Sequence, residues 1–328
     1  MQSIQKQTLS HQTIAKGFCG NTSLLLMFVI LLNYQNMAMA FTRGSRTVQY
    51  GLIIKNQTNR VLDDVNVWAC APAMQSSGFH CCEELEALPP FEKIIDAIGN
   101  QVMLFHIDQL PPYGSKVVQI RAELSDSNNS ASMDKPELFL KKEPFIESDH
   151  PDILGKAINL KGDTPLETAE NIYKWVSENI QYSGYTQKAR GALYALNNKK
   201  GDCTEFMYLF IALSRANNIP ARGIGGYVVH GDAVLNPSQY HNWAEFYANG
   251  KWHIADPQRK QFMQTDADYI AMQILSDDEN SFGSKGKRFW HSHEKEISVR
   301  MESGSPKSRA GYSDFSRVKE KPCSSCPD

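Results

Sequence analysis

Apolar and polar residues alternate with a period of two along much of the first third of the chain. This alternation is typical of half-buried β-strands. Strands are predicted in four segments, which are 47–55, 61–69, 100–107 and 116–124. The polar turn Asn56-Gln57-Thr58-Asn59 predicts that the first two strands form a hairpin. Together the strands predict a small antiparallel β-sandwich over residues 41–124, although residues 70–98 show no pattern that predicts a structure.

The period changes to about 3.6 after a polar stretch at Ser125 to Ser132, which is too poor in apolar residues to pack and predicts a linker over 125–149. A helix is predicted to begin at Thr164-Pro165. Its apolar face consists of Ala169, Ile172, Trp175, Val176 and Ile180. We expect Trp175 to be a core residue and not a functional one.

A second helix is predicted to begin at Cys203, with Gly201 and Asp202 as its cap. It ends at the Asn217-Asn218-Ile219-Pro220 sequence. Strands are then predicted at 221–229, 244–247, 251–255 and 297–301, which we expect to form one sheet. Asn249-Gly250 is a strong signal for a hairpin between two of them. The sequence therefore predicts an α+β catalytic domain over residues 150–302, followed by a disordered tail at 303–328.

The first forty residues have the pattern of a signal peptide. Lys6 and Lys16 are basic, Leu24 to Leu32 are apolar, and Ala38-Met39-Ala40 has the small-x-small form of a cleavage site. The apolar run is shorter than the roughly 20 residues that span a bilayer. We therefore expect an exported protein, periplasmic or extracellular, with no stable membrane span after cleavage. An uncleaved anchor is the alternative.

Composition narrows the class of protein further. Of 328 residues, 41% are hydrophobic and 21% are charged, which is ordinary for a folded globular protein. The net charge of −2 and the lack of a basic stripe argue against a nucleic-acid partner. Export permits disulfides, but the sequence leaves their pairing open. The cysteines after residue 40 are Cys70, Cys81, Cys82, Cys203, Cys323 and Cys326.

Cys203, His241 and Asp256 are the residues with the clearest chemical potential. A cysteine in the first turn of a helix feels the positive end of the helix dipole, which favours the thiolate. His241 at the start of one strand and Asp256 at the end of its hairpin partner can meet across that hairpin. Each residue alone also has an ordinary explanation: half of a disulfide, a strand-start histidine, or a turn aspartate.

Residues 150–260 resemble the transglutaminase-like superfamily. The resemblance rests on five motifs, which are Gly201-x-Cys203-x-Glu205-Phe206, Ala212-Leu213-x-Arg215-Ala216 leading to Ile219-Pro220-Ala221-Arg222, Gly226-Tyr227, His241-x-Trp243-Ala244-Glu245, and Trp252-x-x-x-Asp256-Pro257. It implies an α+β fold with a papain-like core, in which a helix-borne cysteine packs on an antiparallel sheet. It further implies that Cys203 is the nucleophile, His241 the general base and acid, and Asp256 the carboxylate that orients the histidine.

The reaction class that follows is thiol-dependent acyl transfer or hydrolysis at amide bonds of proteins or peptides, through a thioester. Transamidation, deamidation and proteolysis share the first half of this reaction, so a peptidase or amidase acting on envelope peptides is an alternative. A catalytically silent binding module is another. The Cys203 N–H is the expected oxyanion donor, and Tyr182, Asn197 and Asn198 are candidates for the second.

No cofactor and no metal site are predicted. His291-x-His293 with Cys323-x-x-Cys326 would be a weak zinc signal, because the two pairs are far apart in a polar region. The Cys323-x-x-Cys326 pair is equally weak as a redox motif, since it stands at the end of the chain. The acidic run Asp277-Asp278-Glu279 lacks the spacing of a calcium loop.

Overall fold

The structure, a computed structural model, describes residues 45–77, 80–125, 135–263 and 268–302. The predicted signal peptide, the polar stretch 126–134 and the tail at 303–328 lie outside these residues. None of the helices described is both long enough and apolar enough to cross a membrane.

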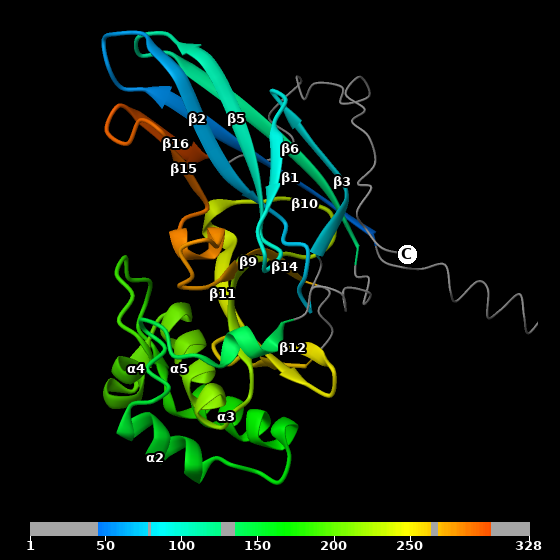
Figure 1. Cartoon of the computed structure of the whole chain (residues 1–328), viewed down its shortest axis with the longest axis vertical. Coiled ribbons are helices and arrows are strands. Elements are labelled where there is room, and N and C mark those ends of the chain that lie inside the picture. Colours follow the sequence, from blue (N-terminus) through cyan, green and yellow to red (C-terminus); the bar gives the residue numbers. More distant parts are fainter. Residues whose placement is uncertain (1–44, 78–79, 126–134, 264–267, 303–328) are drawn as a thin grey trace, which may run out of the picture. The chain divides into compact units, whose positions relative to one another are not determined.

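A β-sandwich forms the part of the molecule in which the blue and cyan strands of Figure 1 lie. In its first sheet, β1 (Ser45–Asn56) pairs on one side with β6 (Ser115–Ser125), which pairs with β3 (His80–Leu88). On its other side β1 pairs with β10 (Ala233–Val234) and β16 (Ile297–Met301). The second sheet has the order β15 (Phe289–His291), β2 (Leu62–Ala71), β5 (Gln101–Leu110) and β4 (Glu92–Ile95).

The predicted hairpin between the first two strands is wrong, because β1 and β2 lie in different sheets. The buried side chain of Asn56 explains the crossing. Its amide donates to the carbonyl oxygens of Arg60, Leu110 and Pro111 at 2.7–3.0 Å, and its Oδ1 accepts from the N–H of Thr58 at 2.8 Å. These bonds turn the chain from one sheet to the other. Both strands still direct their alternating apolar side chains into the shared core.

A central sheet has the order β13 (Gln261–Phe262), β12 (Lys251–Asp256), β11 (Tyr240–Ala248), β9 (Ala221–Val228) and β14 (Tyr269–Leu275). The predicted hairpin joins β11 to β12, with φ of 53° at Asn249 and 79° at Gly250. Residues 297–301 were predicted to complete this sheet. This prediction is wrong, because they pair with β1 as β16. The edge beside β9 is taken instead by β14, an almost wholly buried apolar strand.

Four α-helices of the described residues cover one face of the central sheet: one packs on the strands, where Ala244 and Phe246 of β11 join the apolar cluster of the helices, and the other three pack around it (Figure 1). They are α2 (Pro151–Asn159), α3 (Pro165–Asn179), α4 (Ala192–Asn198) and α5 (Cys203–Ala216). The sequence predicted α3 and α5 but not α2 or α4. Trp175 is half-buried against the helical core, and the ammonium groups of Lys156 and Lys199 each lie 4.5 Å from its ring centroid.

The sandwich and the central sheet share one hydrophobic core. Tyr227 and Val229 at the end of β9, with Ile270 and Met272 of β14, cluster with the apolar residues of β1, β2, β5 and β6. Both predicted ranges, 41–124 and 150–302, thus contribute strands and side chains to the sandwich. The mixed α+β architecture with a helix-borne cysteine is confirmed. The remaining short elements are η2 (Pro136–Leu140), β7 (Gln181–Tyr182), β8 (Lys200–Gly201), η3 (Pro237–Gln239) and η4 (Phe282–Lys285).

Candidate active site

Cys203 is the first residue of α5, and a capping box holds the start of this helix. Oδ1 of Asp202 accepts from the N–H of Thr204 at 2.9 Å, while Oε2 of Glu205 accepts from the N–H of Asp202 at 3.0 Å. A Cβ at Gly201 would lie 2.4 Å from the Cβ of Glu205, so only glycine leaves room for this arrangement. The capping box therefore presents Cys203, partly exposed, at the positive end of the helix.

Two polar residues that the sequence analysis missed tie the preceding loop to this helix start. Thr186 donates from its N–H and hydroxyl to Oδ2 of Asp202 at 2.9 and 3.1 Å. Arg190 pairs with the fully buried carboxylate of Glu205, at 2.6 Å between Nη2 and Oε2. A glutamate such as Glu205, on the core side of a predicted helix, requires a cation as its partner. This requirement is the feature of the sequence from which a partner such as Arg190 could have been predicted.

His241 lies near the start of β11, opposite Gly226 of β9, and is 8% exposed. Its Nε2 is 2.7 Å from Oδ2 of Asp256. Cys203 lies beside His241 in the same cleft and contributes to its electrostatic surroundings, and because Nε2 faces Asp256, Nδ1 is the ring nitrogen left for the thiol. The indole of Trp243 stacks beside the imidazole, with ring centroids 6.4 Å apart. The structure therefore brings Cys203, His241 and Asp256 together in this order.

Asp256 is buried at the end of β12 and accepts three hydrogen bonds. Besides His241, the hydroxyl of Tyr269 donates to Oδ2 at 2.8 Å and the N–H of Arg259 donates to Oδ1 at 3.1 Å. Tyr269 comes from β14 and packs edge-on against Trp243. No local pattern in the sequence connects it to the site. The carboxylate is thus held in one orientation by groups from β11, β14 and the turn that follows β12.

The surroundings of His241 favour its protonated form. Burial alone would lower its pKa, but the hydrogen bond to Asp256 and the nearby Asp256 and Cys203 groups outweigh burial and raise it to about 9. The imidazole is therefore positively charged at neutral pH.

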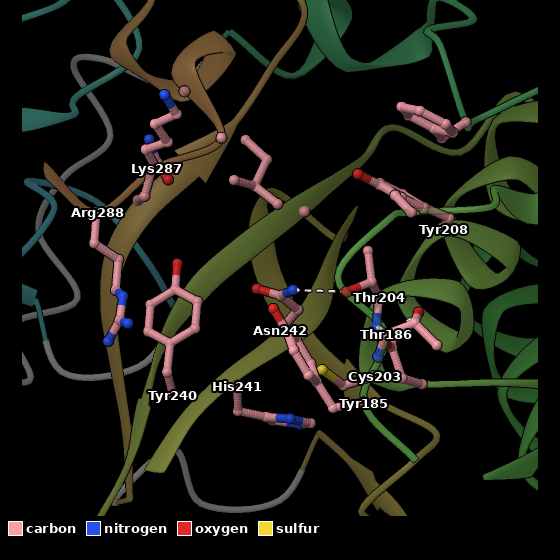
Figure 2. A pocket seen from close by; sticks show the side chains of 18 of the residues that line it. Tyr185, Thr186, Cys203, Thr204, Tyr208, Tyr240, His241, Asn242, Lys287 and Arg288 are labelled. Carbon is pink, nitrogen blue, oxygen red and sulfur yellow. Dashed lines mark hydrogen bonds between the residues drawn. The ribbon is translucent and has the colours of Figure 1, made fainter. Parts of the chain in front are cut away.

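A cleft of about 1420 Å³ lies over Cys203 and His241. Figure 2 shows Cys203 and His241 close to each other in this cleft, with Tyr240 and Asn242, the residues on either side of His241 in β11. The amide of Asn242 donates to the hydroxyl of Thr204 at 3.0 Å, which joins the residues that follow His241 and Cys203 (Figure 2). Of the three candidates for a second oxyanion donor, Tyr182 is among the described residues that line the cleft, and Asn197 and Asn198 are not.

In the described ranges no three His, Cys, Asp or Glu side chains come together as a metal site. Cys70 is buried, and burial raises the pKa of its thiol to about 12. Cys323 and Cys326, the sulfur half of the zinc alternative, lie outside the described residues.

Residues 154–257 match the family profile described as the transglutaminase-like superfamily, which confirms the resemblance for this region. A solved structure from Cytophaga hutchinsonii, described as a candidate cysteine protease, is 19% identical with a TM-score of 0.51 and covers 85% of this chain and 93% of its own. This similarity concerns the fold.

Two further solved structures were also found. The periplasmic domain of TgpA from Pseudomonas aeruginosa is 13% identical with a TM-score of 0.34, and the match covers 63% of this chain and 87% of that one. A red sea bream transglutaminase is 12% identical with a TM-score of 0.26, and the match covers 70% and 50%. No curated protein matches the sequence.

Proposed function

We propose that the protein is a transglutaminase-like cysteine acyltransferase or hydrolase that acts on amide bonds of proteins or peptides. The observation that carries this proposal is the position of His241, which is bonded to Asp256 at 2.7 Å and lies in the same cleft as Cys203. This is the arrangement that a nucleophile, a general acid–base and an orienting carboxylate require.

In the first half of the proposed reaction the thiolate of Cys203 attacks the amide carbonyl carbon. When the tetrahedral intermediate collapses, the C–N bond breaks, and protonated Nδ1 of His241 gives its proton to the departing amine. The product is a thioester on Cys203 and a neutral imidazole. Asp256 keeps the proton on Nε2 throughout, so that Nδ1 is the nitrogen that exchanges protons with the reactants.

In the second half a water molecule or an amine attacks the thioester and passes a proton to Nδ1 of His241. Collapse of this intermediate releases the acyl product and restores the thiolate and the imidazolium. Water on a peptide thioester gives proteolysis, water on a glutaminyl thioester gives deamidation, and an amine gives transamidation.

The oxyanion of both intermediates requires preorganised donors. The N–H of Cys203 belongs to the first turn of α5, where helical N–H groups have no acceptor within the helix. We assign the second donor to the hydroxyl of Tyr182, since its side chain lines the cleft.

A cleft of about 1420 Å³ has room for a segment of a polypeptide substrate. Hydrolysis as the final step is favoured by the description of the Cytophaga structure as a candidate cysteine protease. The leader pattern of residues 1–40 supports an exported protein that meets its substrates in the periplasm or outside the cell.

Alkylation by iodoacetamide across pH, followed by mass spectrometry at Cys203, tests this proposal. An ordinary thiol has a pKa of about 8.5 and reacts slowly in weakly acidic solution. We expect Cys203 to react rapidly at pH 6, and the His241→Ala variant to lose this reactivity by at least about 100-fold. Cys203→Ser serves as the blank. Slow labelling that does not depend on His241 would instead support the silent binding module.

A further inference from the structure

Arg288 lies in the wall of the cleft at a position that the backbone holds firmly. It immediately precedes β15, and its carbonyl oxygen accepts from the N–H of Cys70 in β2 at 2.9 Å. The sulfur of Cys70 lies 3.7 Å from the carbonyl oxygen of Lys287. The main chain at Arg288 is therefore fixed to β2 of the sandwich by a backbone hydrogen bond.

The guanidinium of Arg288 lies against the residue that precedes His241. Its carbon is 4.8 Å from the ring centroid of Tyr240, and its Nη1 donates to the hydroxyl of Tyr227 at 3.1 Å. Figure 2 shows Arg288 alongside Tyr240 on the cleft wall. In the part of the chain described, the hydrogen bonds of this side chain are made by Nη1 alone. Nε and Nη2 donate to no acceptor within the described residues.

Arg288 has no carboxylate partner, in contrast to most arginines near the site; Arg259, which also lines the cleft, likewise forms no ion pair within the described ranges. Arg190, Arg215 and Arg222 each form an ion pair with a buried or nearly buried glutamate. None of the ion pairs within the described ranges includes Arg288, although its side chain is half-buried. A half-buried guanidinium without a carboxylate of its own is well suited to receive one from a ligand.

We infer that Arg288 is a specificity-determining residue that binds a carboxylate of the substrate, so that the preferred substrates are peptides with an acidic group near the reacting amide. The inference rests on the proposed function, because it places this carboxylate in the cleft above Cys203. A guanidinium recognises a carboxylate through two parallel N–H···O bonds, and the Nε and Nη2 edge provides these donors. The carboxylate is either a peptide C-terminus or an aspartate or glutamate side chain.

Matched alkylating reagents test this inference without knowledge of the natural substrate. N-iodoacetylglycine carries a carboxylate, and N-iodoacetylglycinamide is its neutral counterpart. The ratio of their rates at Cys203, divided by the same ratio for glutathione, measures recognition of the carboxylate. His241 acts on both reagents in every variant, so its attraction for anions cancels when variants are compared.

We expect Arg288→Gln to lower this normalised ratio by about tenfold, the factor that corresponds to one charged hydrogen-bonded contact of about 1.4 kcal/mol. Glutamine can still donate to Tyr227, so the wall of the cleft keeps its support. The control is Lys287→Gln, which removes the neighbouring exposed charge. Water and salt screen an exposed charge, and we expect this ratio to change less than about twofold.

A second pair of reagents, N-iodoacetyl-aspartic acid α-amide, whose side-chain carboxylate is free, and its neutral counterpart N-iodoacetyl-asparagine amide, distinguishes a side-chain carboxylate from a terminal one. If Arg288→Gln abolishes the preference of Cys203 for the acidic reagent in either pair, the result supports the inference. Equal ratios for the wild type and Arg288→Gln in both pairs would overturn it, while rapid His241-dependent labelling by iodoacetamide would still leave the proposed function in place.

If Arg288→Gln does not fold, protection of the wild-type protein replaces it. N-acetylglycylglycine should slow the labelling of Cys203 by iodoacetamide at concentrations at which its amide does not. Equal protection by the acid and the amide would contradict the inference.

Discussion

At the scale of single residues, charge is compensated in pairs inside the molecule. Arg215 is buried and pairs with Glu143 at 2.8 Å, while Arg222 pairs with fully buried Glu245 at 2.7 Å. The guanidinium of Arg222 also lies 4.0 Å from the ring centroid of Trp252. Breaking such a pair leaves an uncompensated buried charge, which costs several kcal/mol. The charged motif residues outside the trio therefore maintain the structure around it.

The raised pKa of His241 predicts a pH dependence of stability. In the folded protein this pKa is about 9, against 6.5 for an unperturbed histidine, because Asp256 and Cys203 outweigh the effect of burial. A raised pKa stabilises the folded state fully below the unfolded value, and the stabilisation disappears as pH rises through the folded value. We expect the free energy of unfolding to fall between about pH 6.5 and 9, by up to about 3 kcal/mol.

Urea unfolding of the wild type and of His241→Gln at several pH values measures this effect. The variant should lack the decline across this window, although it will be less stable in acid. Parallel curves for both proteins would show that another group causes the dependence.

Removal of the charge on Asp256 should lower the reactivity of the Cys203 thiol more than it lowers the stability of the fold. In Asp256→Asn the amide can no longer stabilise a positive imidazole, so the pKa of His241 should fall and with it the share of thiolate. We expect the rate of Cys203 alkylation near neutral pH to fall by at least about 100-fold, as is common for such carboxylates.

Tyr269→Phe is the matched comparison, since it removes only the hydroxyl that donates to Asp256 at 2.8 Å. A loss of about three- to tenfold is expected there. Equal effects of the two substitutions on alkylation would argue that orientation, and not charge, is what Asp256 supplies.

At the scale of secondary-structure elements, one side-chain bond joins α5 to β11 beside the reacting groups. The amide of Asn242 donates to the hydroxyl of Thr204 at 3.0 Å, and each residue directly follows a member of the trio. We expect Thr204→Val, which keeps the shape but loses the acceptor, to lower the rate of Cys203 alkylation about three- to tenfold and to shift its pH profile.

Thr204→Ser should restore most of this loss, because the hydroxyl remains. Asn242→Ala combined with Thr204→Val should be no slower than the slower single variant, since both remove the same contact. Additive losses would mean that the two residues act independently.

The elements themselves could be predicted from the sequence where the signal is local. The apolar face of α3, the cap of α5 and the Asn249-Gly250 turn depend on residues within a few positions of each other, and all were predicted correctly. Strand partners depend on residues far apart in the chain. For this reason the pairing of β1 with β16 was missed, and the crossing at Asn56 was taken for a hairpin.

The same distinction applies to the candidate site. Motif residues identified the cysteine, the histidine and the aspartate. Thr186 and Arg190 reach the site from the loop before α4, and Tyr269 reaches it from β14; they were missed because none of them belongs to a recognisable motif.

At the scale of the whole molecule, the sandwich contributes to the site through shared strands. The loop between β9 and β11 forms β10, which pairs with β1 immediately before the strand that carries His241. Arg46 of β1 donates to the carbonyl oxygen of Val229 at 2.8 Å, and the N–H of Thr47 donates to Asp232 at 2.8 Å. Arg288, which immediately precedes β15, and Phe289 of β15 line the cleft, so one end of the second sheet borders it. The sandwich therefore helps to position both sides of the cleft.

This shared core predicts that the region matching the transglutaminase-like superfamily does not fold without the sandwich. A fragment of residues 135–302 would expose the apolar side chains that now pack against β1, β2, β5 and β6, namely Tyr227, Val229, Leu235, Ile270 and Met272. Burial of one such side chain stabilises a fold by about 1.5–3 kcal/mol, so their joint loss is comparable to the roughly 5–15 kcal/mol that holds a typical domain together. We expect the fragment to show no cooperative thermal transition and no rapid labelling of Cys203. Residues 41–302, which lack only the predicted signal peptide and the tail, should unfold in one cooperative transition and label as the full chain does. If the fragment folded cooperatively and its cysteine reacted at the native rate, the sandwich would be a separable domain, and the contacts of β10, β15 and β16 would be dispensable for the site.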